Sequence, residues 1–370
     1  MATTKDYRIG EFTYPRGWFM VAESAELDTH RPVSVRFFGK DFALYRGRES
    51  GKVVLLDAYC PHMKTHLAAP NKTSYIILDG MGTNVEGDNI RCPYHGWRFG
   101  PDGKCNDIPY HAGPIPAAAC VKSWPVVESL GAVWIWHDPE GGEPEWEHPN
   151  LPEWNDPAWV HPKWDHLGVL NQHPQEVIDN ISDYSHLGPI HGSTVTRFEN
   201  EFKGHQAIQR QCGGHRTLVS ADGKGPELHT ITAYNGPGCL ISYMSGMYDG
   251  IILITHTPVD DGSIKVWHSL VVKSPSGAKI ATAPDKINAA HYQELALAAF
   301  AQDFEIWQHK APCLNGLFLP SDGAFMKTRI WYKQFYNPRT KKNEYLEQCE
   351  GVYVPKGIAP YTQEPLKTGT

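Results

Sequence analysis

The chain has 370 residues, 41% of them hydrophobic and 20% charged, so it is long enough for two domains. Its net charge of −7 and pI near 6.2 lack the basic footprint of a nucleic-acid-binding protein. The chain begins with no apolar segment behind a basic start, and its apolar runs are too short to cross a bilayer. We therefore expect a cytoplasmic protein without a membrane or nucleic-acid partner, whose eight cysteines are reduced thiols or metal ligands.

The first part of the chain carries short β-rich runs at residues 33–38, 52–56 and 132–136, separated by Gly, Pro, Asn and Asp. This pattern predicts a small all-β domain, which we assign to residues 1–150. A segment rich in Pro, Gly and acidic residues follows at 138–152 and is interpreted as a linker.

Two short motifs in this first domain each pair a cysteine with a histidine. They are Cys60-Pro-His62 and Cys92-Pro-Tyr-His95. Two thiolates can bind one iron of a 2Fe-2S cluster while two imidazoles bind the other. Structural zinc is the alternative, but zinc fingers usually pair cysteine with cysteine and histidine with histidine. Because each motif here supplies one of each, the pattern favours a Rieske cluster.

The second part, residues 151–370, shows alternating apolar and polar residues at 228–234, 250–255 and 264–272. Alternation of this kind predicts an antiparallel sheet. Apolar residues spaced three and four apart between 284 and 310 predict a long helix that ends before Pro312. The expected fold class is α+β, with an all-β domain followed by a domain that has a large antiparallel sheet and flanking helices.

A second group of candidate metal ligands lies in residues 179–191. On one continuous helix, Asp179, Asp183 and His186 would share a face. His191 would point elsewhere unless the helix broke at Gly188-Pro189, which we expect because proline disfavours helical geometry in the residue before it. Taken alone, the segment is as well explained by an amphipathic helix with solvated acids and two ordinary histidines.

Two histidines and one carboxylate form the facial triad that binds non-haem Fe(II) and leaves positions open for dioxygen. Asp303 is our choice for the carboxylate, with Glu305 as the alternative. Asp303 lies among apolar helix positions, and a buried acid needs a partner in order to stay ionised. A cluster that delivers single electrons and an iron site that consumes them would each explain the presence of the other.

With these motifs in this order, the chain resembles the terminal oxygenase subunits of the Rieske non-haem iron oxygenases over most of its length. The segments 14–18, 97–110, 303–310 and 329–336 most resemble the oxygenase component of 3-ketosteroid 9α-hydroxylases. This resemblance implies a helix-grip catalytic domain, cluster ligands Cys60, His62, Cys92 and His95, and Fe(II) ligands His186, His191 and Asp303.

The resemblance also assigns two further roles and an assembly. Asp183 matches the catalytic aspartate that links a cluster histidine of one subunit to an iron-ligand histidine of the next, which implies a head-to-tail homotrimer. Asn180 would support the iron site. One departure is the 29 residues between His62 and Cys92, more than is usual, so we expect a surface insertion around residues 71–80.

The activity that the resemblance implies is a monooxygenase that hydroxylates a steroid-like polycyclic substrate with O2. The chain lacks a Gly-rich dinucleotide motif, so the electrons would come from a separate NAD(P)H-dependent flavin or iron–sulfur reductase, directly or through a ferredoxin. The alternatives are an aromatic-ring dioxygenase, an oxidative demethylase, a Rieske electron-transfer protein without oxygenase activity and a zinc-stabilised structural protein.

Overall fold

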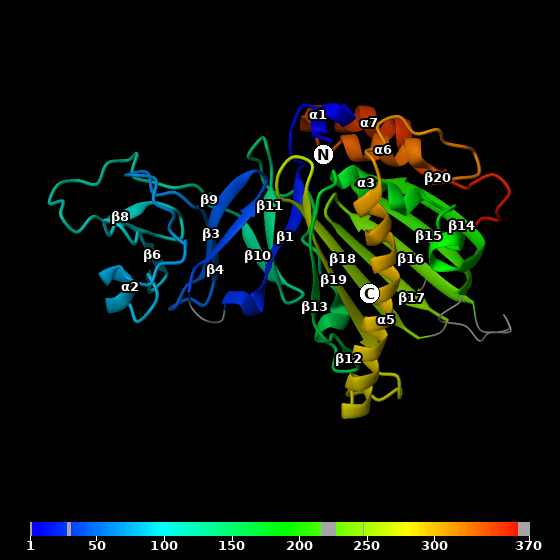
Figure 1. Cartoon of the computed structure of the whole chain (residues 1–370), viewed down its shortest axis with the longest axis horizontal. Helices are drawn as coiled ribbons and strands as arrows, with labels where there is room; N and C mark the ends of the chain where they lie inside the picture. Colours follow the sequence, from blue (N-terminus) through cyan, green and yellow to red (C-terminus); the bar gives the residue numbers. More distant parts are fainter. Residues whose placement is uncertain (1, 28–30, 216–226, 247, 362–370) are drawn as a thin grey trace. The chain divides into compact units, whose positions relative to one another are not determined.

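The computed structural model describes residues 2–27, 31–215, 227–246 and 248–361. The chain forms two compact units. Figure 1 shows the whole chain coloured by position in the sequence. One unit contains Trp18–Asn150 and Thr257–Asp260, and the other contains Met1–Gly17, Leu151–His256 and Asp261–Thr370. Residues 2–17, which we assigned to the first domain, lie in the second of these units.

Hydrogen bonds explain where the N-terminal residues belong. The backbone amide of Thr4, at the start of the short helix α1 (Thr4–Tyr7), donates to Asp261 at 2.7 Å. The buried guanidinium of Arg16 donates to the backbone carbonyl of Gln334 at 3.2 Å. These partners lie more than 250 residues away in the sequence, so no local pattern could indicate them.

The unit of residues 18–150 and 257–260 is all-β, as the sequence predicts. Its turns follow local chemistry: Phe38 and Gly39 both have positive φ and form the two-residue turn between β2 (Val33–Phe37) and β3 (Lys40–Arg46). The short helix α2 (Tyr75–Asp79) lies between the cluster motifs. The three sheets are β1 (Gly17–Glu23), β11 (Ala132–His137), β10 (Val126–Ser129); β2 (Val33–Phe37), β3 (Lys40–Arg46), β4 (Val53–Asp57), β9 (Ser123–Trp124); and β5 (Val85–Glu86), β6 (Asn89–Arg91), β7 (Arg98–Phe99), β8 (Cys105–Asp107).

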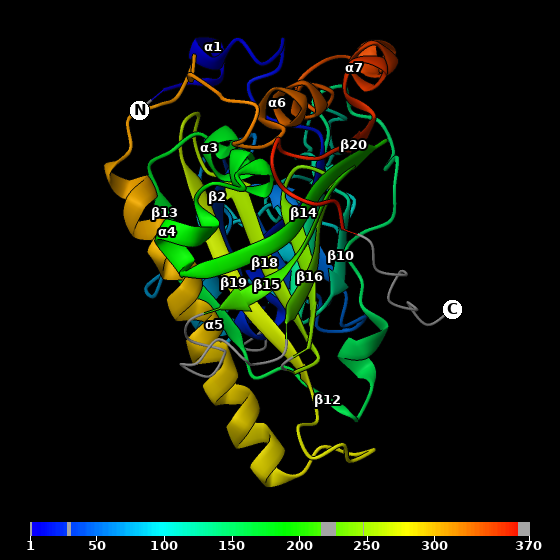
Figure 2. The same ribbon diagram turned by 90° about the vertical axis from the view of Figure 1, so that its right-hand side faces the viewer.

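The second unit is built on a nine-stranded antiparallel sheet, which confirms the expected α+β fold (Figures 1 and 2). The sheet's central strands follow one another in the sequence, so most neighbours are joined by simple reversals. In spatial order the strands are β12 (Trp159–Val160), β19 (Ile264–Lys273), β18 (Gly250–Pro258), β17 (Cys239–Ser245), β16 (Leu228–Asn235), β15 (Gln206–His215), β14 (Ser193–Lys203) and β20 (Gly351–Tyr353), and β13 (Trp164–Leu170) also pairs with β19.

The long helix α5 (Ala283–His309) packs along this sheet beside β19 (Figure 2). Thr282 and Asp285 form a capping box at its start, with each side chain bonded to the other residue's backbone amide. Its apolar residues pack against the sheet in two buried clusters: Leu170, Val177, Ile264, Val266, Phe304 and Trp307, and Val160, Met244, Leu270, Val272 and Ala289. Burial of these side chains fixes the position of α5 and therefore of every residue that it carries.

The remaining helices are short. Helices α3 (Pro174–Ile178) and α4 (Leu187–His191) precede β14, and α6 (Phe325–Lys333) packs against α7 (Lys342–Cys349) at the same end of the sheet as α1 (Figures 1 and 2). In the part of the chain that the structure describes, no helix is both long and apolar enough to span a membrane.

Candidate active site

The first candidate centre lies on two loops of the smaller unit. Cys60 follows β4, and its amide donates to the Thr65 carbonyl at 3.0 Å. Cys92 follows β6, and its amide donates to the Trp97 carbonyl at 2.7 Å. Each loop thereby closes on itself and directs its cysteine inward, because both cysteines are only 1% exposed.

The two histidines of these loops lie nearer the surface. His62 is exposed, and its ring centroid is 4.5 Å from that of His95. Trp97 stacks on His62 with 5.0 Å between ring centroids and 3° between planes. The structure thus brings two buried sulfurs and two outer imidazoles together. The imidazoles lie nearer the surface, where another protein could exchange electrons with the centre.

Hydrogen bonds prepare the cysteines to act as ligands. The Cys60 thiol donates a hydrogen bond to the sulfur of Cys92, which also accepts hydrogen bonds from the backbone amides of Tyr94 and His95 and from the Thr65 side chain. Together these bonds outweigh the effect of burial and lower the pKa of Cys92 to about 6. Bonding to Cys92 and burial raise the pKa of Cys60. One thiolate therefore forms readily, whereas the second needs a cation beside it. A cysteine and histidine set with these properties suits a 2Fe-2S cluster.

The predicted insertion between the two motifs is exposed but also contacts the second cluster loop. Tyr75 and Leu78 of α2 are 77% and 53% exposed. Just before the helix, the Ser74 hydroxyl donates to the Pro93 carbonyl at 2.7 Å. The insertion therefore supports the loop that carries Cys92 as well as covering the surface.

The segment of the second centre is not the continuous helix that the sequence suggests. A 3₁₀ turn spans Asp179–Ser182 and ends at Asp183, whose ψ of 87° is not helical, and α4 begins only after His186. We expected the helix to break at Gly188-Pro189. The break instead falls at Asp183. Pro189 is the third residue of α4, where a backbone N–H would have no helical acceptor, so proline is accommodated there.

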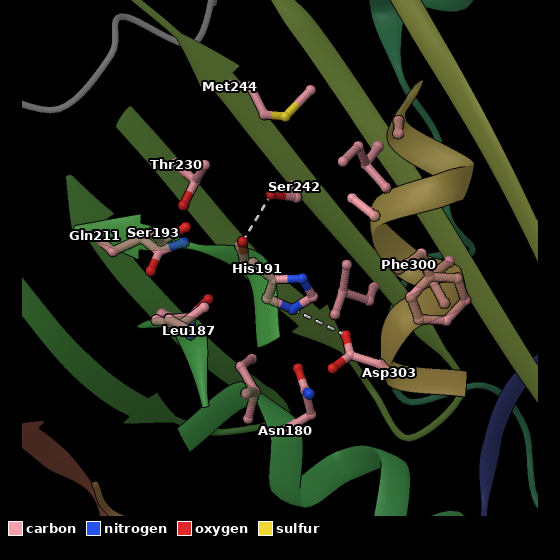
Figure 3. A pocket seen from close by; sticks show the side chains of 18 of the residues that line it. Asn180, Leu187, His191, Ser193, Gln211, Thr230, Ser242, Met244, Phe300 and Asp303 are labelled. Atoms are coloured by element: carbon pink, nitrogen blue, oxygen red, sulfur yellow. Dashed lines mark hydrogen bonds and ion pairs between the residues drawn. The ribbon is translucent and has the colours of Figure 1, made fainter. Parts of the chain in front are cut away.

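The broken segment nevertheless brings both histidines to the same carboxylate on α5. Nε2 of His191 lies 3.2 Å from Oδ2 of Asp303 (Figure 3). Nε2 of His186 lies 3.8 Å from Oδ1 of the same residue. The donor atoms of the three residues lie within 4.8 Å of one another. Asp303 is buried, whereas the alternative Glu305 is exposed and outside this group.

The other nitrogen of each imidazole has a partner of its own. Nδ1 of His186 donates to the backbone carbonyl of Asp183 at 2.6 Å. Nδ1 of His191 donates to the side-chain oxygen of Gln302 at 3.1 Å. Neither Nε2 atom therefore carries a proton, and each has a lone pair that can bind a metal; Nε2 of His186 also accepts from the Asn180 amide at 3.3 Å. We did not predict Gln302, although its position directly before Asp303 could have indicated it.

Comparison with protein families decides between the alternatives left open by the sequence. A family described as the 3-ketosteroid 9alpha-hydroxylase C-terminal domain matches residues 135–336, and the Rieske 2Fe-2S domain matches residues 17–125. The chain is 34% identical over 87% of its length to a probable 3-ketosteroid-9-alpha-monooxygenase oxygenase component of Rhodococcus rhodochrous, covering 80% of that protein.

The chain belongs to the family of 3-ketosteroid 9α-hydroxylase oxygenase components. It is therefore a Rieske-type monooxygenase, the terminal oxygenase of a system with a separate reductase and O2. A relative from Mycolicibacterium smegmatis is 33% identical over 87% of this chain and 82% of its own. Another, named cholesterol 7-desaturase, from Ciona intestinalis, is 29% identical over 89% of this chain and 74% of its own.

Solved structures show the same fold at low sequence identity. NdmA of Pseudomonas putida CBB5 with caffeine is 17% identical, with a TM-score of 0.67 over 92% of this chain and 97% of that one. Dicamba monooxygenase with non-heme iron and dicamba is 18% identical, with a TM-score of 0.60 over 89% of this chain and 98% of that one. The two-domain Rieske oxygenase fold predicted from the motifs is thereby confirmed.

Two more residues of the catalytic unit lie beside the three candidate iron ligands. The Asp183 carboxylate accepts hydrogen bonds from the His186 amide at 3.1 Å and the Ser185 hydroxyl at 2.8 Å. Burial opposes its ionisation, but His186 and Ser185 outweigh burial and lower the pKa of Asp183. Asn180 lies close as well, with Nδ2 3.3 Å from Nε2 of His186.

A cavity of about 210 Å³, measured as space open to the centre of a water molecule, adjoins the three ligands. It lies between α5 and the facing side of the sheet (Figure 3). Apolar side chains form most of its wall, including Leu187, Leu240, Ile252, Ile254, Leu295 and Phe300. A largely apolar cavity with a few polar groups is typical of a site for a small organic substrate.

Proposed function

We propose that this oxygenase hydroxylates a steroid-like polycyclic substrate at a mononuclear Fe(II), with electrons that enter through the Rieske cluster. The observation that carries the proposal is the meeting of His186, His191 and Asp303 at an apolar cavity. The names of the relatives support a steroid as the substrate. The proposed ligands are His186, His191 and Asp303 for Fe(II), and Cys60, His62, Cys92 and His95 for the cluster.

The residues present suit a mononuclear iron. Two imidazole nitrogens and one carboxylate, all partly or fully buried, form the set that binds non-haem Fe(II) on one side. Fe(II) held in this way supplies the activation of O2. The protein's own contribution is to hold the imidazoles through the Asp183 carbonyl and Gln302, and to place a substrate carbon in a largely apolar cavity beside them.

The assembly is a second part of the proposal. We infer a head-to-tail homotrimer in which Asp183 of one chain meets a cluster histidine of its neighbour. Asp183 is suited to such a contact because its side chain is 29% exposed and its carboxylate is already bonded to His186. His62 is exposed as well, so it can be reached by another chain. A heterologous contact of this kind closes into a ring.

A cytoplasmic location completes the proposal. The eight cysteines of the chain are all free. Unpaired cysteines in this number suit a reducing compartment, where NAD(P)H-dependent reductases also operate.

The substrate is tested by turnover. Purified oxygenase is combined with a reconstituted reductase, NADH and O2, and offered 3-ketosteroids, their coenzyme A esters and non-steroid aromatic compounds. We expect a product heavier by one oxygen atom from a steroid, and no product from Asp303→Ala. Turnover of simple aromatics alone would contradict the steroid assignment, and a product lighter by two hydrogens would indicate desaturation.

Electron transfer between chains is tested with mixed assemblies. Cys92→Ser removes a cluster ligand and leaves the iron site, whereas Asp303→Ala does the reverse. Each variant alone should be inactive. When the two are mixed and reassembled, activity should return, because electrons from an intact cluster reach the intact iron site of a neighbouring chain. If the mixture stays inactive although it assembles, the transfer between chains is refuted.

A further inference from the structure

One buried histidine in the cavity wall has no part in the metal centres. His268 is fully buried on β19 and lines the cavity beside α5. Side chains alternate along a strand, so it shares its face with Val266 and Leu270, both of which belong to the apolar clusters packed on α5. Phe300 stacks near it, with 6.2 Å between ring centroids.

Asp165 determines which ring nitrogen of His268 carries a proton. Its carboxylate lies 3.1 Å from Nδ1 of His268 and also accepts from Gln293 at 2.8 Å. Burial opposes ionisation of Asp165, but hydrogen bonds from His268, Gln293 and Lys163 outweigh it and lower its pKa to about 2. An ionised carboxylate can only accept, so the proton lies on Nδ1.

The other ring nitrogen, Nε2, is left without a partner. No group among the described residues forms a hydrogen bond to it, although it is buried. A buried polar atom of this kind costs about 1–3 kcal/mol, so native proteins seldom leave one unbonded without a reason. A partner supplied by the ligand of the cavity would remove the cost.

We propose that Nε2 of His268 binds a hydroxyl group of the substrate, and that this oxygenase accepts polycyclic alcohols. The inference rests on the proposed function and specifies its substrate class. A hydroxyl can donate to Nε2 when the imidazole is neutral and can accept from it when the imidazole is charged, whereas a ketone oxygen can only accept. The hydroxyl therefore suits this nitrogen in either state, and His268 is a specificity-determining residue.

The position of His268 relates the bound hydroxyl to the iron site. Phe300, which stacks near His268, precedes Asp303 by three residues on α5, or about 4.5 Å along the helix axis. Phe300 thus lies about one helical turn from Asp303, so His268 and the candidate ligand carboxylate adjoin the same stretch of α5. Binding there would fix which carbon of a rigid polycycle is presented for oxidation.

A second polar region lies across the cavity. The side-chain oxygens of Gln211 on β15 and Thr230 on β16 are also buried without a hydrogen-bond partner among the described residues. Three strand spacings, or about 14 Å, separate β16 from β19, with apolar residues of β17 and β18 between them. This arrangement suits an elongated apolar molecule with one polar group at each end.

The test compares steroid pairs that differ only by a hydroxyl or a ketone at carbon 3 or carbon 17. Dissociation constants are measured by calorimetry with the iron-loaded oxygenase. In the unmodified chain, the alcohol of one pair should bind about tenfold more tightly than its ketone. His268→Phe and His268→Leu, two apolar replacements of different shape, should abolish this preference. His268→Gln should retain it, because its amide can donate to Asp165 and present its oxygen to the cavity.

His256→Phe serves as the matched control, because His256 is equally buried on the adjacent strand β18 but outside the cavity wall. It should leave the preference unchanged. Equal binding of alcohol and ketone, or a preference that survives both apolar replacements, overturns the role of His268 while the steroid assignment stands. Failure of every steroid to bind overturns the assignment and this inference together.

Discussion

Replacement of Asp183 by asparagine should separate iron binding from electron transfer. The backbone carbonyl of Asp183, and not its carboxylate, accepts the Nδ1 proton of His186 at 2.6 Å. Asparagine keeps that carbonyl, and its side-chain oxygen can still accept from the His186 amide and Ser185. What is lost is a negative charge 3.7 Å from Nδ1 of His186. Changes beside a metal-ligating histidine weaken metal binding by about 10–100-fold, and we expect the lower end, or about 1.4 kcal/mol.

The assay measures two quantities in the same samples. Iron content per chain should stay near that of the unmodified protein in Asp183→Asn under excess Fe(II), but fall in Asp303→Asn. The rate at which O2 and substrate reoxidise the reduced cluster should fall far more than iron content in Asp183→Asn. Ser185→Ala is the control, because it removes one hydrogen bond to the Asp183 carboxylate but leaves the negative charge of Asp183 in place. This variant should retain most of the rate. Iron loss equal to that of Asp303→Asn would refute the reasoning, because Asp183 would then be a ligand.

Four further predictions concern the cluster, the iron site and stability. Cys92→Ser should abolish the visible absorbance of the cluster while iron at the mononuclear site remains, as metal analysis can show. Gln302→Leu should lower iron affinity about tenfold, because Nδ1 of His191 loses its partner, whereas Gln302→Glu should restore it. Thr282→Ala should lower the free energy of unfolding by about 1 kcal/mol in urea titrations, because it removes the cap of α5. At pH 5, Asp165→Asn should have a lower free energy of unfolding than the unmodified protein. This difference should shrink as the pH falls from about 4 towards 2, because the pKa of the Asp165 carboxyl is 3.8 in the unfolded chain and about 2 in the folded one.

Much of the fold and most of the candidate site could be predicted from the sequence, because local patterns determine them. Alternating residues indicated β16, β18 and β19, and the apolar spacing at 284–310 indicated α5 almost to its ends. The cysteine and histidine motifs predicted the candidate cluster site from ligands at short spacing. The candidate iron site was predicted less directly, because Asp303 was chosen for its place among apolar helix positions and through the family resemblance.

The errors arose where tertiary contacts decide. Residues 1–17 join the catalytic unit through partners such as Asp261, which no local pattern shows. The segment around Asp183 looked helical by spacing, but the Tyr184 amide donates to the carbonyl of Asp322 at 2.9 Å instead of continuing a helix. Gly323 adjoins this contact, and its φ of 138° brings it so near the Ser182 carbonyl that a side chain would not fit.

Helix α5 contributes both the candidate ligand carboxylate and one wall of the cavity. It contains no glycine, and its only proline lies in the first turn, so its sequence offers no point at which it would kink. Leu295 lies eight residues before Asp303, or about 12 Å along the axis. Leu295, Phe300 and Asp303 are therefore held at fixed spacing along one helix, and all three line the cavity. A molecule in the cavity that contacts Leu295 and Phe300 and a metal ion bound by Asp303 would therefore both act on the same helix.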